Sequence, residues 1–555
     1  MTFALIGASL LICLAPDMTW INTDCDGAHY VYSAENLYPA HKTSAPLYLL
    51  LGNLFINLPG DMTDFWKMGL ISVIAGVIAS VFIYLTVKRL ILAAVSSERR
   101  RAFGLIAAVL YSLSALVISQ ETIVESYSLL TMTVVGAYYF SVSKKWILAA
   151  VFMGAGFAIH WLSFLAIAPI IFFNRELWRP RYLGVIAAFA LFYLYIPLTN
   201  RAPYMWTQNP ALGNEAGFFV QDIAATIGML VGGMAIWDVP KRLIETIMLL
   251  GVSLNVGLIG VGRYFWKSKP LNDPLFWMII LPVVLFFGNL AIQTYVYLMP
   301  TIAFGSIAAA VGFSQIQAKT FRKASPVVVL AIFLIGLYNT VYFDIGENLD
   351  PNLEAARFYN EELSKVPDGA ILMPIQGWEW AMIFKYNADQ GRNIIPVYRG
   401  SLPGDKYVEQ IAFEYGINVD LGDFTGDADF NQAAEYRSQS IIALNPVVYT
   451  TRATDPRNYG AEVIPAVLGV QYIQATGIDL ENPSWRFDVD NPYDIITGAV
   501  EVERWVNVMY SNITVFLVAV IGSVGIMVAW FLEQLAKGRR FSRGEFKRKI
   551  RVFKG

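Results

Sequence analysis

Long apolar runs separated by short polar segments dominate this chain of 555 residues. A transmembrane helix needs about 20 predominantly apolar residues, and many of the runs approach or exceed that length. The pattern therefore predicts an α-helical polytopic membrane protein. The runs cover about residues 3–16, 65–87, 102–119, 127–142, 146–174, 182–199, 243–262, 274–290, 295–313, 326–343 and 508–533.

Basic residues beside the runs predict the orientation, because cytoplasmic loops are enriched in Lys and Arg. Lys88 and Arg89 place the loop after the second run in the cytoplasm, and Lys144 and Lys145 do the same after the fourth. Three arginines within residues 175–181 also predict a cytoplasmic position. Two segments on the same side of the membrane must be joined by an even number of crossings, yet only one run separates these arginines from Lys145. We therefore expect the run 146–174 to form two short helices that meet near residues 156–160, toward the outer face. About 12 crossings result, with both termini cytoplasmic.

This orientation places all the unusual polar segments on the outer side of a plasma membrane. They are the loop 24–59, the turn 120–125, His160, the loop 200–237 and residues 346–505. Segments 46–58 and 217–237 are apolar but poorly suited to crossing, so we expect them to lie at the membrane interface.

The long segment before the last run has a different pattern. Short β-rich runs at 370–373, 394–398, 441–444 and 447–450 alternate with helical patterns at 353–363 and 405–415. Such alternation predicts a small α/β domain. The expected organisation is a multi-spanning transmembrane domain (1–343), an extracytoplasmic acidic α/β domain (344–505), a transmembrane helix (506–536) and a basic cytoplasmic tail (537–555).

Composition agrees with this reading and narrows the partners. The chain is 56% hydrophobic and only 15% charged, which excludes an ordinary soluble domain. Residues 346–505 hold 25 acidic and 11 basic side chains, whereas the last 19 residues hold nine basic and one acidic. The basic tail suits anionic lipid headgroups, and the split argues against nucleic-acid binding. Cys13 and Cys25 lie inside and outside the first run, so we expect no disulfide and no metal spacing. The first run has no charged segment before it and no small-residue cleavage site after it, so we expect a retained anchor.

Candidate chemistry concentrates directly after the first run. Asp24, Asp26, His29, His41 and Lys42 fall within 19 positions. Carboxylates beside a bilayer are costly to desolvate, so they are expected in a water-filled cavity where they act on a substrate. Asp26 would serve as a general base or a metal ligand. Asp24 would share that role or cap a turn, and the alternative for the whole stretch is a charged polar loop without function.

Further candidates follow along the chain, each with a structural alternative. Glu125 lies where one apolar run gives way to the next, and it is either catalytic or a helix-start carboxylate stabilised by the macrodipole. His160 is a site residue or a hydrogen-bonded core histidine. Arg201, followed by Trp206, would bind a phosphate or extend its charge to the headgroups.

The order and spacing of these residues resemble a membrane family related to the protein O-mannosyltransferases, which have the GT-C glycosyltransferase fold. That family has Asp-Ser-Gly-Glu and, 15 residues after the Asp, His-Pro-Pro-Gly-Tyr-Pro-Leu-Tyr. Here Asp26 is followed at that spacing by His-Lys-Thr-Ser-Ala-Pro-Leu-Tyr at 41–48. Similar matches follow at Ser119-Gln120, at 124–127, at the glycines before His160, and at 195–198 and 205–210. The similarity covers roughly residues 5–310, with a weaker echo at 368–372.

Three positions depart from the family pattern. His29 replaces its Glu, Thr199 stands where its Arg follows Pro-Leu, and Asn209 replaces its Asp. Asp26 and Glu125 are retained as the expected catalytic residues. The departures affect the expected phosphate contacts and any metal.

The resemblance implies a glycosyltransferase that uses a polyprenyl-phosphate sugar on the outer face. The acceptor is a protein or a glycan or lipid, and the reaction inverts the anomeric carbon. We expect donor and acceptor contacts from Asp24, His29, His41, Lys42, His160, Arg201 and Trp206, some of which match the family motifs and some of which lie beside them. A divalent cation is a candidate cofactor, with Asp26 and Glu125 as its ligands.

Two other classes of protein share some of these features. A transporter or flippase also holds buried carboxylates and broken helices, but its ionisable groups lie near the midplane in paired halves. Here they fall in outer loops, and the sequence has no internal repeat. A membrane anchor that only presents the 344–505 domain would have an unremarkable first loop, unlike this chain.

Overall fold

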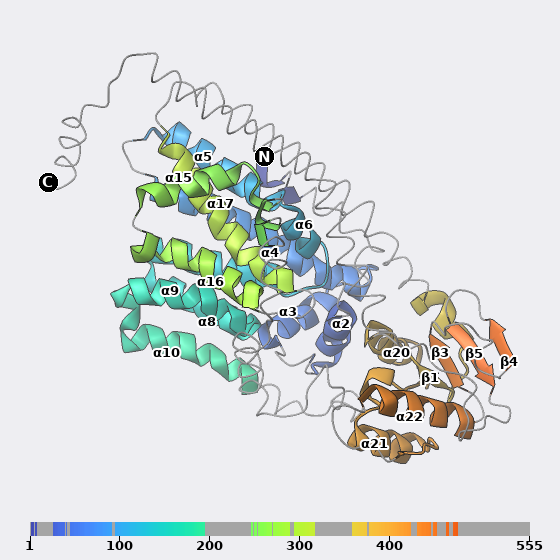
Figure 1. Ribbon diagram of the computed structural model, residues 1–555. Coiled ribbons are helices and arrows are strands. Elements are labelled where there is room, and N and C mark those ends of the chain that lie inside the picture. The colour runs from blue at the N-terminus through green and yellow to red at the C-terminus, as the bar shows by residue number, and fades with distance from the viewer. Residues whose placement is uncertain are drawn as a thin grey trace, which may run out of the picture.

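The computed structural model describes a helical part and an α/β part (Figure 1). The described residues are 2–4, 6–7, 26–38, 40, 45–91, 95–194, 246–247, 249–251, 253–268, 270–288, 294–316, 358–374, 377–422, 430–445, 448–451, 462–465 and 470–474. The expected runs at 326–343 and 508–533, the interfacial segment 217–237 and the basic tail lie outside these residues.

The helical part consists of α-helices joined by short 3₁₀ turns. The α-helices are α2 (Asp26–Asn36), α3 (Pro46–Ile56), α4 (Asp64–Leu90), α5 (Ser97–Ser112), α6 (Ala115–Glu121), α7 (Tyr127–Val142), α8 (Trp146–Ile159), α9 (Phe164–Phe173), α10 (Pro180–Ala188), α15 (Gly257–Lys267), α16 (Pro274–Gly288) and α17 (Met299–Ser314). The 3₁₀ turns are η2 (Trp161–Ser163), η3 (Arg175–Trp178), η4 (Phe189–Leu194), η5 (Pro270–Asn272) and η6 (Thr294–Leu298).

Helix α4 organises the helical part. It packs against α3, α5, α7 and α17. The Thr63 side chain accepts the Trp66 N–H at its start, and Lys88 and Arg89 lie in its last turn, where the helix dipole favours positive charge. With 27 residues it is about 40 Å long, enough to cross a bilayer.

Among the described residues, two segments are long and apolar enough to cross a membrane, namely α4 and Val296–Ser314. The other apolar helices are shorter, so the count of about 12 crossings stays a prediction. The expected break in the run 146–174 is confirmed: α8 ends at Ile159, His160 is extended, and α9 follows after η2. With 14 and 10 residues these helices are about 21 and 15 Å long, shorter than the bilayer core.

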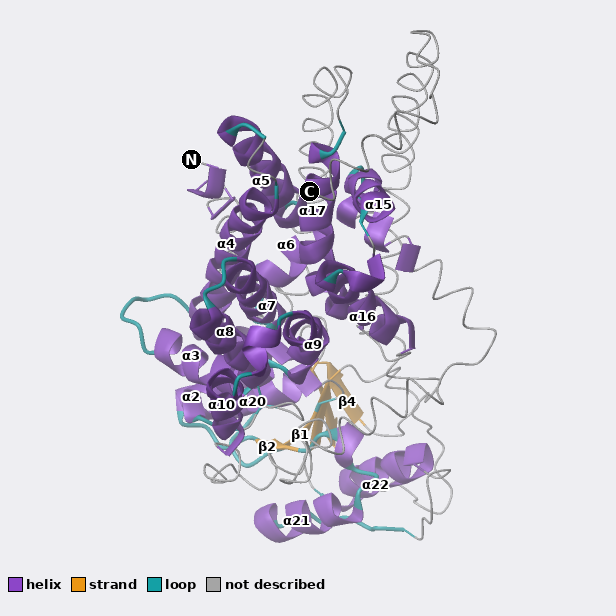
Figure 2. Cartoon of the chain, turned by 90° about the vertical axis from the view of Figure 1, so that its left-hand side faces the viewer, coloured by secondary structure: helices purple, strands orange, loops and turns teal. Residues whose placement is uncertain are grey.

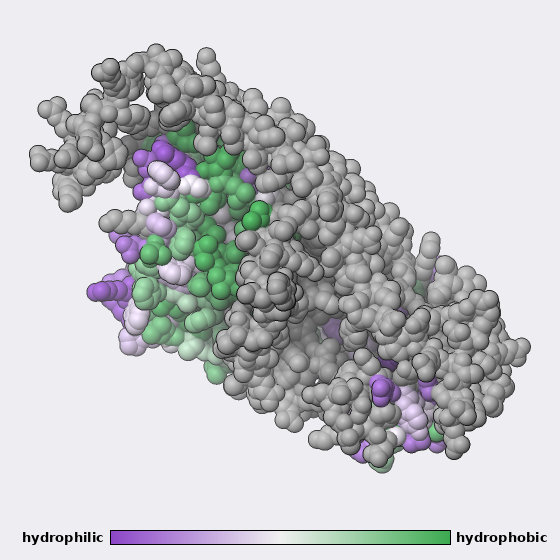
Figure 3. Space-filling model, in the orientation of Figure 1, coloured by the Kyte–Doolittle hydropathy of each residue, from purple (hydrophilic) through white to green (hydrophobic). Residues whose placement is uncertain are grey.

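The exterior of the helical part is apolar. Figure 3 shows hydrophobic side chains gathered over much of its visible described surface. Large apolar side chains project outward from several helices, which in water would be an aggregation hazard but in lipid is favourable. We conclude that this part lies in a membrane. Exposed examples are Ile147, Phe164, Phe172, Leu191, Trp266 and Val284.

Helices α15 and α17 make the closest backbone approach in this region. A Cβ atom built on Gly312 would lie 1.9 Å from the carbonyl oxygen of Gly260, and one on Gly260 would lie 2.3 Å from the carbonyl oxygen of Ala309. Small residues at such crossings let membrane helices pack without side chains between them. The crossing therefore depends on glycine at both positions.

The α/β part contains a five-stranded sheet of order β2-β1-β3-β5-β4. Strand β1 pairs in parallel with β2 and β3, while β3–β5 and β5–β4 are antiparallel. In Figure 2 the strands lie between the membrane helices and the helices α21 and α22. The bounds are β1 Ile371–Met373, α20 Gly377–Gln390, β2 Ile395–Pro396, α21 Asp405–Tyr415, α22 Phe430–Leu444, β3 Val448–Thr451, β4 Glu462–Pro465 and β5 Val470–Gln474, with short turns η8 (Phe358–Glu362), η9 (Leu363–Lys365) and η10 (Arg399–Ser401).

Most of the expected elements of this part are present. The predicted strands at 370–373, 394–398 and 447–450 correspond to β1, β2 and β3, and the helix at 405–415 is α21. The strand predicted at 441–444 is wrong, because these residues form the last turn of α22. A short buried apolar run cannot be assigned to strand or helix by periodicity alone. Asn445 completes the helix end, since its side chain donates to the Ile441 carbonyl at 2.8 Å.

Candidate functional site

Helix α2 carries the first group of candidate residues. Asp26 is its first residue, and Tyr30 follows one turn later. The described side chains of the helix's first turns are buried, and His29 is 3% exposed. The side chain of Asp26 lies outside the described atoms, as do residues Asp24, His41, Lys42, Arg201 and Trp206.

Helix α3 holds α2 at its side and at its C-terminal end. The rings of Tyr30 and Tyr48 meet edge to face with centroids 5.0 Å apart. The side-chain amide of Asn53 donates to the Ala34 carbonyl at 2.9 Å, which satisfies one of the carbonyls left open at a helix end. Gly52 lets the helices approach, because a Cβ there would lie 2.9 Å from that of Ala34. The position of α2 is thus set by packing and capping together.

Glu125 lies in the turn between α6 and α7 and is 4% exposed. Its Oε1 accepts the Ser126 N–H at 2.6 Å and the Ser126 hydroxyl at 3.1 Å. Its main-chain carbonyl accepts the Ser72 hydroxyl of α4 at 3.0 Å. These bonds place a negative charge at the start of α7, as expected for a helix-start carboxylate. The charge of Glu125 also acts on the Tyr48 hydroxyl, so Tyr48 connects Glu125 with α2.

His160 occupies the break between α8 and α9 and is 4% exposed. Its Nδ1 accepts the Leu162 N–H at 3.1 Å, so the neutral ring carries its proton on Nε2 and can donate from there. The ring lies 5.5 Å from that of Tyr127, centroid to centroid. His160 therefore has the bonded position expected of a core histidine, at the break between the two helices.

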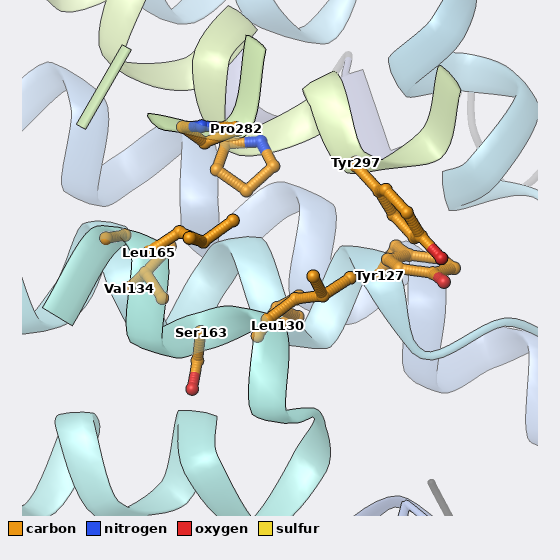
Figure 4. Close-up of a pocket in the computed structure, with 10 residues that line it drawn as sticks. Tyr127, Leu130, Val134, Ser163, Leu165, Pro282 and Tyr297 are labelled. Carbon is orange, nitrogen blue, oxygen red and sulfur yellow. The ribbon is translucent and has the colours of Figure 1, made fainter. Parts of the chain in front are cut away.

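An apolar pocket opens beside His160 and Tyr127 (Figure 4). The pocket is narrow, with a cavity volume of about 10 Å³, room for about one water molecule, and it is partly open to the exterior. The rings of Tyr127 and Tyr297 lie 6.0 Å apart, and Figure 4 shows their hydroxyl groups together at one end. The remaining walls are almost entirely hydrocarbon. They are formed by Leu130, Val134, Leu162, Ser163, Leu165, Ala166, Pro282 and Pro300.

His29 does not join this pocket in the described contacts. Its ring meets that of Trp380 of α20 edge to face, with centroids 6.0 Å apart. Within the described part of the chain, no three His, Cys, Asp or Glu side chains are grouped to hold a metal ion. The cation expected at Asp26 and Glu125 therefore stays a prediction.

Sequence reasoning missed Tyr48, Tyr127, Tyr297 and Trp380. Tyr48 and Tyr127 lie inside the quoted family motifs, and their place in these motifs could have identified them as site residues. Tyr297 and Trp380 come from segments far along the chain, and only the fold brings them to α7 and α2.

A family comparison supports the class of protein that the sequence predicts, a membrane glycosyltransferase. Residues 26–177 match the family described as "Protein O-mannosyl-transferase TMEM260 N-terminal domain". The matched region begins at Asp26 and includes Glu125 and His160. It confirms the predicted resemblance to the protein O-mannosyltransferases.

Distant solved structures were also found. ArnT from Cupriavidus metallidurans in the apo state is 12% identical, with a TM-score of 0.47, over 85% of this chain and 97% of that one. The same protein bound to undecaprenyl phosphate is 12% identical, with a TM-score of 0.48, over 86% of this chain and 99% of that one. The Archaeoglobus fulgidus oligosaccharyltransferase, tethered to an acceptor peptide containing the NVT sequon, is 13% identical. Its TM-score is 0.42, over 84% of this chain and 74% of that one. The comparison with curated proteins gave no match.

Proposed function

We propose that this protein transfers a sugar from a polyprenyl-phosphate donor to a hydroxyl group of a protein on the outer face of the plasma membrane. Asp26 acts as the general base, and Glu125 supports the acceptor or a cation. The reaction inverts the anomeric carbon. Both termini are cytoplasmic, and residues 344–505 lie outside.

One observation carries this proposal. The hydroxyl groups of Tyr127 and Tyr297 lie together at one end of an otherwise largely hydrocarbon pocket, and the His160 ring lies 5.5 Å from that of Tyr127, centroid to centroid. A donor with a long apolar tail and an anionic head needs such a boundary between an apolar and a polar wall. A water-soluble donor does not need the hydrocarbon wall.

The reaction requires a general base beside the acceptor hydroxyl and hydrogen-bond donors beside the departing phosphate. The Asp26 carboxylate takes the proton of the acceptor hydroxyl, whose oxygen forms a bond to the anomeric carbon. The bond from that carbon to the phosphate oxygen breaks, and its electron pair stays on the phosphate. The hydroxyls of Tyr127 and Tyr297 and the Nε2–H of His160 stabilise the departing phosphate by hydrogen bonds.

The remaining candidates are assigned by position along the chain. His41 and Lys42 follow α2 in the first loop and contact the donor phosphate with Arg201. Asp24, His29 and Trp206 contact the sugar or the acceptor. Of these residues His41 and Trp206 match the family motifs, whereas Asp24, His29, Lys42 and Arg201 are assigned by their place beside those motifs, and each is a separate target for mutation.

A transfer assay with purified protein and a small panel of polyprenyl-phosphate sugars tests this proposal. Leu165→Trp narrows the pocket and should raise the KM for the donor about tenfold, since it removes apolar contacts from the tail. Phe164→Trp is the matched control, because the neighbouring side chain is exposed on the same helix. Its KM should stay at the wild-type value.

The alternative of transport predicts a different result in the same preparation. A flippase would move a lipid-linked sugar across a vesicle membrane without forming a glycosylated product. Such movement, with no transfer from any donor of the panel, would refute the proposed function.

A further inference from the structure

Helix α20 of the α/β part packs directly on α2, the helix that begins with Asp26 (Figure 1). Trp380 meets His29, and about one turn further along each helix Phe384 meets Tyr32, with ring centroids 5.6 Å apart. The Trp380 and Phe384 rings also contact each other at 4.7 Å. These side chains are all buried, so the interface has a packed aromatic centre.

Lys385 of α20 adds a set of ion pairs to this interface. Its Nζ lies 3.0 Å from Glu35 of α2, 2.7 Å from Asp64 at the start of α4, and 2.8 Å from Asp389 of its own helix. The Tyr359 hydroxyl donates to Asp389. The ammonium is 4% exposed, so three elements converge on one buried cation.

The electrostatics of α2 explain why the cation must come from α20. Glu35 lies in the last turn of α2, where the helix dipole disfavours negative charge, and that turn has no basic residue. Burial raises the pKa of Glu35, and Lys385 opposes that rise. Burial would lower the pKa of Lys385, but hydrogen bonds to Asp389 and Asp64 and the charge of Glu35 raise it above its usual value. The lysine therefore stays charged at physiological pH.

We propose that Lys385 is a positioning residue for the transfer reaction, holding α2 in place through Glu35 and α4 through Asp64. A helix of 11 residues is marginal by itself, so its orientation depends on its neighbours. The α/β part is then a component of the active site, and it fixes the helix that presents the base to the acceptor. This inference rests on the proposed function for its kinetic consequence.

Two readouts on the full-length protein test the inference. Lys385→Met keeps the hydrocarbon stem but removes the charge. Hydrogen exchange of the α2 amides should become about tenfold faster, because the helix loses its anchor. The kcat of transfer should fall about tenfold while the donor KM stays within about twofold, since the donor pocket is elsewhere.

Lys385→Arg should restore most of the kcat, because the cation is retained. Asp368→Asn is the matched control: it breaks the ion pair with Arg392 inside the α/β part and touches neither α2 nor α4 in the described contacts. It should leave both readouts unchanged.

Wild-type exchange and wild-type kcat in a folded Lys385→Met protein would overturn the inference. If that variant does not fold, Glu35→Gln is used, because it removes only one of the three ion pairs. It must also speed the exchange of the α2 amides and lower the kcat of transfer, each by a smaller factor. If wild-type protein transfers no sugar, the proposed function fails, and the exchange of α2 still decides whether Lys385 orders this helix.

Discussion

Gly76 of α4 offers a sharp test of how the Glu125 turn is held. Ser72, Gly76 and Ser80 follow one another at successive turns of this helix. Ser72 bonds to the Glu125 carbonyl, and Ser80 bonds to Ser112 of α5 at 2.6 Å. Between them, a Cβ on Gly76 would lie 2.1 Å from the carboxyl carbon of Glu121 and 2.4 Å from both of its oxygens.

The cost of Gly76→Ala follows from that overlap. Ordinary contact needs more than 3.4 Å, so the Glu121 carboxyl must move by more than 1 Å. This carboxyl ends a flexible side chain, but it is fully buried and belongs to the last residue of α6, four residues before Glu125, so we expect its movement to disturb the packing of the turn. Overpacking costs about 1–3 kcal/mol, and the better helix propensity of Ala returns about 1 kcal/mol. We expect a net loss of up to about 2 kcal/mol and a fall in transfer activity.

A double-mutant cycle with Glu121→Ala measures the contact. Unfolding free energies of the four proteins in mixed micelles should give a favourable coupling of about 1–2 kcal/mol, because the shorter side chain makes room for the new methyl group. Gly184→Ala in α10 is the control, since no atom lies within 4 Å of its added Cβ, and it should be neutral or slightly stabilising. If the two effects add within about 0.5 kcal/mol, the packing of Glu121 on Gly76 is not what positions the turn.

Three further predictions concern other parts of the molecule. Glu125→Gln keeps the acceptor atom for Ser126 but removes the charge, so transfer should fall about 10- to 100-fold with little loss of thermal stability, as activity and melting assays would show. Gly312→Ala should destabilise the helical part by about 1–3 kcal/mol in unfolding experiments, because the obstacle is the Gly260 backbone, which cannot rotate away. The raised pKa of Lys385 predicts that its stabilising effect is complete below its ordinary value of about 10.5 and is lost only as the pH rises through the higher folded value. The difference in unfolding free energy between wild type and Lys385→Met should therefore be constant from about pH 6 to pH 10, and a decline within that range would contradict the assignment.

Patterns in the sequence were sufficient for elements whose signal is local. The helices α4 and α7 follow apolar runs with clear ends, and the break at His160 follows from counting basic residues on either side of 146–174. Asp26, Glu125 and His160 were singled out because motif spacing marks them, and their roles in catalysis stay predictions. The error at 441–444 has the opposite cause, since four apolar residues fit a buried strand and a helix end equally well.

Contacts between distant segments were beyond the sequence. Nothing near Trp380 or Lys385 in the chain indicates that they meet His29 and Glu35 more than 300 positions earlier. Similarly, Tyr297 joins Tyr127 only because α17 packs beside α7. Such pairs depend on tertiary packing, which neither periodicity nor local motifs encode.

The central claim is that Asp26, at the start of α2, is the base of a sugar transfer. The direct measurement compares transfer rates of Asp26→Asn and Asp24→Asn proteins that fold normally, with a polyprenyl-phosphate sugar as donor. We predict a fall of roughly 100-fold or more for Asp26→Asn, the usual scale for loss of a general base, and a smaller effect for Asp24→Asn. A larger loss at Asp24 would move the base to that residue, and full activity in both variants would contradict the mechanism.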